Sequence, residues 1–437
     1  MFYGDVEGSY YSSFFSIYIN TVENLPKNQE DILKFMKKYA PTFLHEFIHY
    51  LQDLYLPYCI RLNLVRLRWL ENIMCTASDN IVSRPFSDWN EDCQCTRAQH
   101  DFTWGKGQVI HQICHIDLSE PTTCKVSASD KKWGKREFTL YSYTLLVTTV
   151  DKGKIEYTLG ARDLLEYIAY KIEKKHFPDI SPLPQLPYDS VDILFEKYGL
   201  SHISEEMRIC IAEACLCNDN PVHYLFIKFL NNDWLKNEFL SQNSYGDEMF
   251  YQKLSDIVFR TKDNVVESLQ EKIARRLGQF QEDLKIFYDD STQILNWLDK
   301  VNASLAKLFP DKFIFYRIYR MNLTEVYHFI GQVLCAIGIP VIINKEGDCF
   351  LYNGDEGNEF FNLIVWRGLL DFMMDSKMQD CPIRKICKKN IKLRCNGIKI
   401  FKKEWLNGNY TACPYLKLYR KYNVKNIQIK NVAVGEK

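Results

Sequence analysis

The sequence lacks an excess of charge of either sign, since 55 lysines and arginines balance 55 aspartates and glutamates. Such a chain carries no overall field that attracts nucleic acid or an anionic membrane, so binding to either would need a local patch. An uninterrupted apolar run of membrane-spanning length is also missing, and residues 1–7 contain neither a basic nor an apolar segment of the signal-peptide type. These absences predict a cytoplasmic protein that does not contact a membrane.

The cysteines lack the regular spacing of a disulfide framework. Fifteen of them, an odd number, are spread along the chain, which is typical of reduced thiols in a reducing compartment. Four lie near the C-terminus, at Cys381, Cys387, Cys395 and Cys413. Because no Cys-x-x-Cys pair occurs among them, unpaired cysteines are favoured over a second, structural zinc site. The tail is rich in lysine and arginine between residues 384 and 403, and it is the only surface that we consider for nucleic acid or an acidic partner.

What the sequence does contain is an alternation of strand-like and helix-like segments. β-Branched and aromatic residues at 13–21 and 138–150 predict strands, and the tripeptide at 151–153 predicts a hairpin turn after the second strand. Helical periodicity dominates from 190 to 309, and the segment 313–378 is mixed. The predicted fold class is therefore α+β.

A proline-rich stretch divides the chain after the first predicted domain and is typical of a linker. We expect a first domain at 1–177, a helical domain at 188–310 and a mixed α/β region at 311–437 that ends in the cysteine-bearing basic tail. Two shorter segments carry expectations of their own. Polar composition predicts an irregular surface excursion at 76–106, and aromatic residues predict a strand at 313–319.

The most informative feature is the pentapeptide from His45 to His49, an H-E-x-x-H pattern inside an apolar segment. An α-helix turns once in about 3.6 residues, so in a helix the two histidines lie on one face, one turn apart. They can then bind one metal ion together, and Glu46 lies beside them, where it can take a proton from water. The pattern predicts a catalytic zinc site with His45 and His49 as ligands and Glu46 as the general base.

The surrounding residues favour such a helix over a chance match or a solvated polar stripe. Pro41 suits the first helical turn, where its missing N–H costs nothing. An apolar face and a polar face follow at helical spacing. The apolar face carries Leu44, Phe47, Ile48, Leu51 and Tyr55, and the polar face carries His45, His49, Gln52 and Asp53.

Two histidines need a third protein ligand, because catalytic zinc sites normally offer three ligands and leave the fourth position for water. In the metzincin pattern a glycine and a third histidine follow at the positions that Gln52 and Tyr55 occupy here, so that subclass is excluded. The motif, together with Glu166 in a Glu-x-x-Ala sequence, resembles the gluzincin type of zincin metallopeptidase. The resemblance implies that Glu166 is the third ligand, and the long separation of the two motifs implies an insertion between them.

The same resemblance implies a zincin-like fold in the first domain, with a small sheet, the motif helix and a third-ligand helix, as well as one catalytic Zn²⁺ and a protein substrate. Bacterial intracellular proteases, some of them acting in phage defence, are similar in their H-E-x-x-H-x-x-Gln sequence and long helical remainder. We therefore predict a zinc metallopeptidase that cleaves an intracellular protein by Glu-assisted attack of zinc-activated water. The oxyanion needs a further donor, for which Tyr167 and Tyr170 are candidates. The alternatives are an inactive zincin-like scaffold and a metal-dependent hydrolase of a non-peptide amide or ester.

Other side chains compete for roles in this site. Asp53 shares the histidine face and is predicted to orient an imidazole through a hydrogen bond rather than to bind the metal. Glu213, a helical carboxylate beside small residues, is the second choice for the third ligand. His111 and His115 have the same separation of four residues, but they lie in a strand-like segment and are predicted to be structural.

Overall fold

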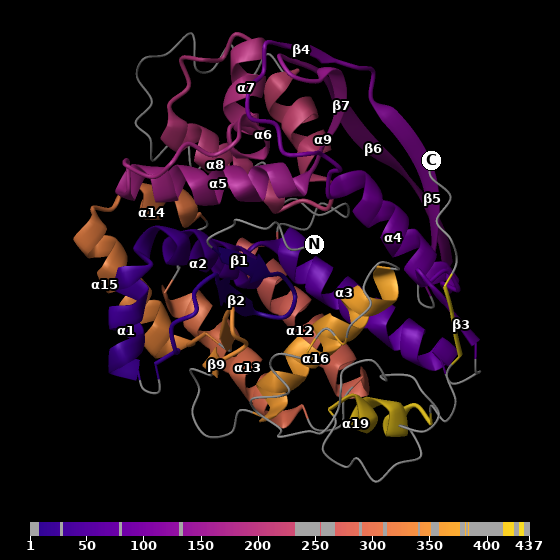
Figure 1. Cartoon of the computed structure of the whole chain (residues 1–437). Coiled ribbons are helices and arrows are strands. Elements are labelled where there is room, and N and C mark those ends of the chain that lie inside the picture. Colours follow the sequence, from indigo (N-terminus) through magenta and orange to yellow (C-terminus); the bar gives the residue numbers. More distant parts are fainter. Residues whose placement is uncertain are drawn as a thin grey trace.

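The structure is a computed structural model that describes residues 8–26, 29–77, 81–130, 134–231, 254, 267–287, 291–308, 313–339, 341–350, 358–375, 381, 383, 414–423 and 428–431. Helices and small sheets alternate along the chain (Figure 1), which confirms the predicted α+β class. No helix in this part of the chain has the length and apolar content that a membrane crossing requires. The tail positions Cys387, Cys395 and Cys413 and the basic stretch 384–403 lie outside the described residues.

The first sheet joins strands from both ends of the chain. Strands β1 and β2 form an antiparallel hairpin, β2 pairs in parallel with β8, and β9 turns back along β8. The sheet is therefore built from the predicted first domain and the predicted C-terminal region together. Its strands, in order, are β1 (Gly8–Tyr11), β2 (Ser16–Ile19), β8 (Val341–Asn344) and β9 (Cys349–Phe350).

The hairpin turn between β1 and β2 shortens the strand that the sequence predicts at 13–21. Ser13 and Phe15 adopt φ values of 72° and 48°, which lie outside the extended region. Only Ser16–Ile19 forms the strand. Arg66 stabilises the turn, since its Nη1 donates to the carbonyl of Ser12 at 2.9 Å.

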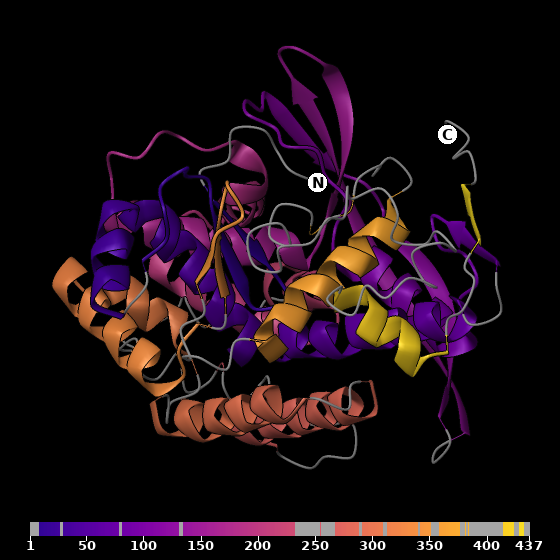
Figure 2. The same cartoon turned by 60° about the horizontal axis from the view of Figure 1, so that its bottom comes forward.

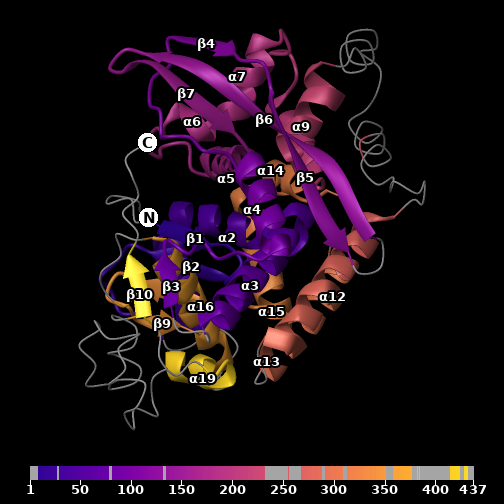
Figure 3. The same ribbon diagram turned by 90° about the vertical axis from the view of Figure 1, so that its right-hand side faces the viewer.

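The second sheet is built around one long strand. β6 (Gly134–Thr149) pairs with β5 (Thr122–Asp130) along its first part, and with β4 (His115–Leu118) and β7 (Gly153–Leu159) along its second part, always antiparallel. β6 and β7 form the predicted hairpin, with Gly153 at φ +69°, a value that glycine adopts without strain. β5 and the first part of β6 form a long two-stranded ribbon (Figures 2 and 3). A further pair of parallel strands is formed by β3 (Ile81–Arg84) and β10 (Gln428–Asn431).

Helices pack around these sheets and form most of the core. In Figure 1, α5 lies directly above α2, and α12, α13 and α16 lie below them. The helices are α1 (Gln29–Lys38), α2 (Ala40–Tyr55), α3 (Pro57–Ala77), α4 (Glu91–Thr103), α5 (Ala161–His176), α6 (Gln185–Tyr188), α7 (Ser190–Lys197), α8 (Glu205–Leu216), α9 (Pro221–Leu225), the π-helical η1 (Phe226–Leu230), α12 (Leu269–Phe287), α13 (Thr292–Leu308), α14 (Phe315–Arg320), α15 (Leu323–Ala336), α16 (Asn358–Met374) and α19 (Pro414–Lys421).

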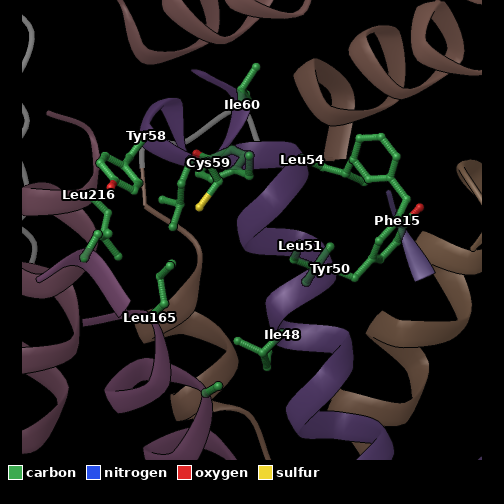
Figure 4. Packing of buried hydrophobic residues seen from close by; sticks show 14 of the residues in the cluster. Phe15, Ile48, Tyr50, Leu51, Leu54, Tyr58, Cys59, Ile60, Leu165 and Leu216 are labelled. Atoms are coloured by element: carbon green, nitrogen blue, oxygen red, sulfur yellow. The ribbon is translucent and has the colours of Figure 1, made fainter. Parts of the chain in front are cut away.

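Helix α2 is the central element of the core. It packs against α3, α5, β1 and β2, and its Phe47, Ile48, Leu51 and Leu54 are fully buried. Figure 4 shows leucines of α5 and α8 on one side of α2 and Phe15 on the other. Each apolar side chain buried in this way stabilises the fold by about 1.5–3 kcal/mol. This packing holds α2 rigidly, with its polar face toward α5.

The stretch 76–106 differs from the predicted irregular excursion, because it contains β3 and the helix α4. Asn90 caps α4 by accepting the backbone N–H of Cys93 at 2.8 Å. In the helix only Cys93, Cys95 and Thr103 are buried. A helix with so few buried side chains shows little hydrophobic periodicity in its sequence. For this reason the polar composition predicted a loop.

The predicted strand at 313–319 is wrong, because the helix α14 (Phe315–Arg320) occupies most of this segment. Glu213 of α8 accepts the backbone N–H groups of Ile314 (2.7 Å) and Phe315 (3.0 Å). These bonds satisfy donors that a helix start leaves without an intrahelical partner. A long-range contact thus overrides the local preference of the aromatic and β-branched residues for a strand.

Candidate metal centre

Helix α2 carries the H-E-x-x-H sequence in its middle. The helix begins at Ala40 with Pro41 in its first turn, as predicted, and ends at Tyr55. The two imidazoles lie one turn apart, with 4.9 Å between the ring centroids of His45 and His49. The helix therefore presents both histidines on one face, as the spacing requires.

Helix α5 places Glu166 opposite this face. Gly160 precedes the helix, and a side chain there would collide with the backbone of Trp104. The Asp163 Oδ2 atom accepts the N–H of Gly160 at 2.7 Å and closes the first turn. The Gln52 Nε2 atom donates to the carbonyl of Leu165 at 3.0 Å. This last bond joins α2 to α5 directly beside Glu166.

The three residues predicted as metal ligands meet between α2 and α5. The Nε2 atoms of His45 and His49 are 3.2 Å apart, and Glu166 Oε2 lies 3.3 Å from the first and 3.4 Å from the second. In a tetrahedral zinc site with bonds of about 2.0–2.1 Å, neighbouring ligand atoms are about 3.3–3.4 Å apart. The spacing and the donor set therefore fit zinc. Within the described part of the chain, no other group of three or more His, Cys, Asp or Glu side chains converges in this way.

Hydrogen bonds orient both imidazoles. His45 Nδ1 lies 2.8 Å from Glu173 Oε2, and His49 Nδ1 lies 2.8 Å from Gln52 Oε1. Both oxygens are acceptors, so each Nδ1 atom donates. When the imidazoles are neutral, both Nε2 atoms then present lone pairs toward the carboxylate of Glu166. Three acceptors that face one another without a donor make a site for a cation.

The charges of the site shift the pKa values of its members. Burial lowers the pKa of His45, but its hydrogen bonds to Glu166 and Glu173 outweigh burial and raise it well above the usual range. The pKa of His49 is also raised, since the charge of Glu166 outweighs burial. Burial disfavours ionisation of Glu166, yet His49 and His45 hold its pKa well below the usual range. Protons and a metal ion therefore compete for these nitrogens.

Glu46 lies buried within the same group of charges. Burial raises its pKa to about 7, His45 and His49 oppose this rise, and Glu166 and Glu173 add to it. A carboxylate with a pKa close to neutrality is suited to act as a general base. The chemistry available to this arrangement is metal-assisted hydrolysis.

Asp53 does not orient an imidazole, which corrects the role predicted from the sequence. Its Oδ2 atom accepts the hydroxyl of Tyr10 at 2.9 Å and the N–H of Ser13 at 2.7 Å. These bonds turn its carboxylate toward the β1–β2 hairpin, and Glu173 and Gln52 take the predicted role. Asp53 still acts close to the site, because the Tyr10 ring that it holds stacks on His49 with 6.4 Å between centroids.

Tyr188, at the end of α6, is a second phenol beside the candidate ligands, in addition to Tyr10, whose hydroxyl donates to Asp53. Its ring meets His45 edge-on at 6.2 Å between centroids and packs on Tyr170 at 5.4 Å. The next residue, Asp189, accepts a hydrogen bond from the buried Lys171 at 2.7 Å, which fixes this segment to α5. The charge of Glu166, followed by burial and the charge of Glu46, raises the pKa of Tyr188 well above its usual range. Tyr188 therefore keeps its proton and is a hydrogen-bond donor.

The two tyrosines considered from the sequence have other surroundings. The hydroxyl of Tyr167 donates to Asp192 Oδ1 at 2.7 Å, on the side of α5 that packs on α7. Tyr170 reaches the site only through its ring contact with Tyr188. Neither makes the ring contact with His45 that Tyr188 makes.

The remaining candidates lie apart from the centre. Glu213 is fully buried and caps α14, and burial raises its pKa to about 8. It is not part of the convergent group. His111 and His115 are exposed and are not part of the convergent group either. Cys381 is partly buried and is not part of the convergent group.

Comparison of the chain with family models, with curated proteins and with solved structures found no match. The site therefore has to be interpreted from its own geometry and chemistry.

Two residues of the site were missed by sequence reasoning. Glu173 lies seven residues after Glu166, two helical turns along the same face of α5, so its position was a usable signal. Tyr188 follows the proline-rich stretch, and no pattern in the sequence singles it out among 27 tyrosines.

Proposed function

We propose that the protein is a zinc-dependent metallopeptidase of zincin-like organisation, with an intracellular protein as its substrate. The observation that carries the proposal is the convergence of His45, His49 and Glu166 at tetrahedral spacing, with Glu46 on the same helix. Zinc in this site would polarise the substrate carbonyl and increase the acidity of water. Glu46 takes the proton of the attacking water and passes it to the leaving amine.

Tyr188 supplies the donor that the reaction needs besides zinc. Negative charge develops on the oxygen of the substrate carbonyl, and a neutral phenol beside His45 can donate a hydrogen bond to that oxygen. Glu173 and Gln52 keep the imidazoles in the orientation that binds metal. The segment 185–188 is also tied to the loop after α4 by two backbone hydrogen bonds of 3.1 Å between Leu186 and Ile110.

A peptide substrate is favoured because an edge strand runs beside the centre. β1 is the terminal strand of its sheet among the described residues, and its Tyr10 stacks on His49. A β-carbon placed on Gly8 would lie 3.3 Å from Glu46 Cγ, so β1 passes within contact distance of the proposed base. An extended peptide can add to such an edge through backbone hydrogen bonds. A small non-peptide amide or ester would not need this strand.

Metal analysis of four purified proteins tests the proposal. We expect one equivalent of zinc in wild type and in Glu46→Gln, and loss of zinc in His45→Ala and Glu166→Ala. Absence of stoichiometric metal from wild type rejects the proposal. Iron in place of zinc also rejects it, because two histidines and one carboxylate form an iron site in some oxygenases.

A survey of protein amino termini tests the reaction. Cells that produce the wild type should contain new amino termini that are absent from cells producing Glu46→Gln. Zinc without new termini would identify a binding scaffold or a hydrolase of other amides, and would reject the peptidase.

A further inference from the structure

Three cationic side chains surround one carboxylate where α3, α12 and the loop after α8 meet. Arg276 Nη2 lies 2.9 Å from Asp219 Oδ1, and Arg61 Nη1 lies 3.9 Å from the same oxygen. Lys272 precedes Arg276 by one turn on the same face of α12. Its Nζ donates to the carbonyl of Cys217 at 2.6 Å, two residues before Asp219. We call Arg61, Lys272, Arg276 and Asp219 the cationic cluster; three positive charges and one negative charge give it a net charge of +2.

The single carboxylate does not compensate the cations around it. Burial raises the pKa of Asp219, but Arg276, Arg61 and Lys272 outweigh burial and hold it well below the usual range, so Asp219 stays ionised. Burial lowers the pKa of both Lys272 and Arg276, and Asp219 opposes the shift in each. A neighbouring cation adds to it, Arg276 for Lys272 and Arg61 for Arg276. Each pair of cations therefore repels at close range.

The cluster also has more hydrogen-bond donors than acceptors. A guanidinium carries five N–H groups and an ammonium three. The contact of Arg61 with Asp219 is too long for a hydrogen bond, and Arg61 donates to no other described residue. Arg276 donates only to Asp219 within that part of the chain, and its buried Nε has no partner. Lys272 uses one donor on Cys217. Several N–H groups thus remain for a further acceptor.

The cluster differs from an ordinary solvated basic surface. Lysines and arginines on such a surface extend into water, whereas the side chains of Arg61 and Arg276 are only 17% and 12% exposed. Asp219, which they meet, is 56% exposed, so the cluster opens to solvent at this carboxylate. A dissolved anion can therefore approach beside Asp219 and reach cations that are already held in place.

We propose that the cationic cluster binds a phosphate dianion, either free phosphate or the phosphate group of a small phosphomonoester. Phosphate oxygens each accept more than one hydrogen bond, and the planar fork of arginine matches their geometry. A phosphomonoester carries a charge of about −1.5 to −2 at pH 7, which balances the net charge of the cluster. The bound group links α3 to α12 beside the loop that carries Asp219. This site does not depend on the proposed peptidase function.

Isothermal titration calorimetry of the zinc-loaded protein tests the proposal with two probes, inorganic phosphate and adenosine monophosphate. The ionic strength is kept constant with KCl, so that screening does not change during the titration. Wild type should bind one equivalent of at least one probe. A preference of tenfold or more for adenosine monophosphate assigns a phosphomonoester as the ligand, and equal or weaker binding of this probe assigns free phosphate.

Substitutions in the cluster should change the affinity in opposite directions. Arg61→Gln breaks no hydrogen bond of the described chain, so it should fold normally and weaken phosphate binding at least about tenfold. Asp219→Asn removes the competing negative charge and should tighten binding. The matched control is Lys285→Gln on the same helix, where an exposed lysine pairs with Glu282; it should bind like wild type. Equal unfolding midpoints without phosphate show that the variants fold.

Phosphate bound by zinc has to be distinguished from phosphate bound by the cluster, because a metal ion also attracts phosphoryl oxygens. His45→Ala and Glu166→Ala remove candidate metal ligands and should bind the probe like wild type. Absence of saturable binding in wild type overturns the proposal, as does loss of binding in both metal-ligand variants. Wild-type affinity in Arg61→Gln also overturns it. None of these outcomes depends on peptide cleavage, so failure of the peptidase would be seen separately.

Discussion

Glu173 accepts a hydrogen bond from His45 at 2.8 Å, although the two residues are 128 positions apart in the chain. Glu173 lies two helical turns after Glu166 on the same face of α5. This one helix therefore supplies both a candidate metal ligand, Glu166, and the group that orients a second candidate ligand, His45. Any shift of α5 along α2 would therefore disturb two parts of the centre at once.

Removal of this carboxylate should weaken metal binding. Glu173→Ala leaves His45 Nδ1 without its acceptor, so we expect zinc affinity to fall by about 10–100-fold. Competition with a chromophoric chelator measures the change. Glu156→Gln, on the exposed face of β7, is the control and should bind zinc like wild type. Unchanged affinity in Glu173→Ala would contradict the orienting role.

Loss of the Tyr188 hydroxyl should slow the reaction without releasing the metal. In Tyr188→Phe the ring contacts with His45 and Tyr170 remain, but the donor to the oxyanion is gone. We expect kcat to fall by about 10²–10³-fold, with wild-type zinc content. Tyr170→Phe, which keeps the packing of the neighbouring ring, should cut normally. A kcat loss shared equally by both variants would assign the effect to packing.

Substitution of Gly8 should separate metal binding from catalysis. In Gly8→Ala the new methyl group would lie 2.5 Å from Thr42 Cγ2 and 3.0 Å from the Tyr18 carbonyl, so β1 must move away from α2 and Glu46. We expect zinc to be retained and peptide cleavage to fall strongly in a kinetic assay. Gly278→Ala on α12, where nothing lies within 4 Å of the added atom, is the control. Wild-type cleavage by Gly8→Ala would show that β1 is not used.

Glu213 should matter for stability and not for metal. Glu213→Ala leaves two buried backbone N–H groups, those of Ile314 and Phe315, without acceptors. The free energy of unfolding in a denaturant titration should fall by about 2–5 kcal/mol, and zinc content should not change. Glu196→Gln, on the exposed side of α7, serves as the control. Loss of zinc from a folded Glu213→Ala protein would reopen the ligand assignment.

The titration of Glu213 should also be visible in the pH dependence of stability. Burial raises its pKa in the folded protein from 4.5 to about 8. Between these two pH values the folded state binds more protons than the unfolded state, so stability falls as pH rises through this window. Unfolding free energies measured across it should fall less steeply with pH in Glu213→Gln than in wild type. Identical slopes would show that Glu213 is ionised in the folded protein.

Local sequence signals were sufficient to predict the helix α2 and the site residues that it carries, His45, Glu46 and His49. Pro41 marks the start of α2, and its apolar residues recur at the spacing that buries one face. Helix α4 was missed because few of its side chains are buried, and α14 because its cap comes from a glutamate 101 positions away. Glu166 was named through a family resemblance rather than through its spacing.

The sequence by itself determined that His45, Glu46 and His49 lie together, because a separation of four residues in a helix places two side chains on one face regardless of the rest of the fold. Only the tertiary structure decided which acids and which phenol complete the centre. Glu166, Glu173 and Tyr188 reach the histidines through the packing of α5 and α6 on α2. That packing depends on the burial of apolar surface by the whole chain, so a local sequence pattern does not predict how α5 and α6 pack on α2.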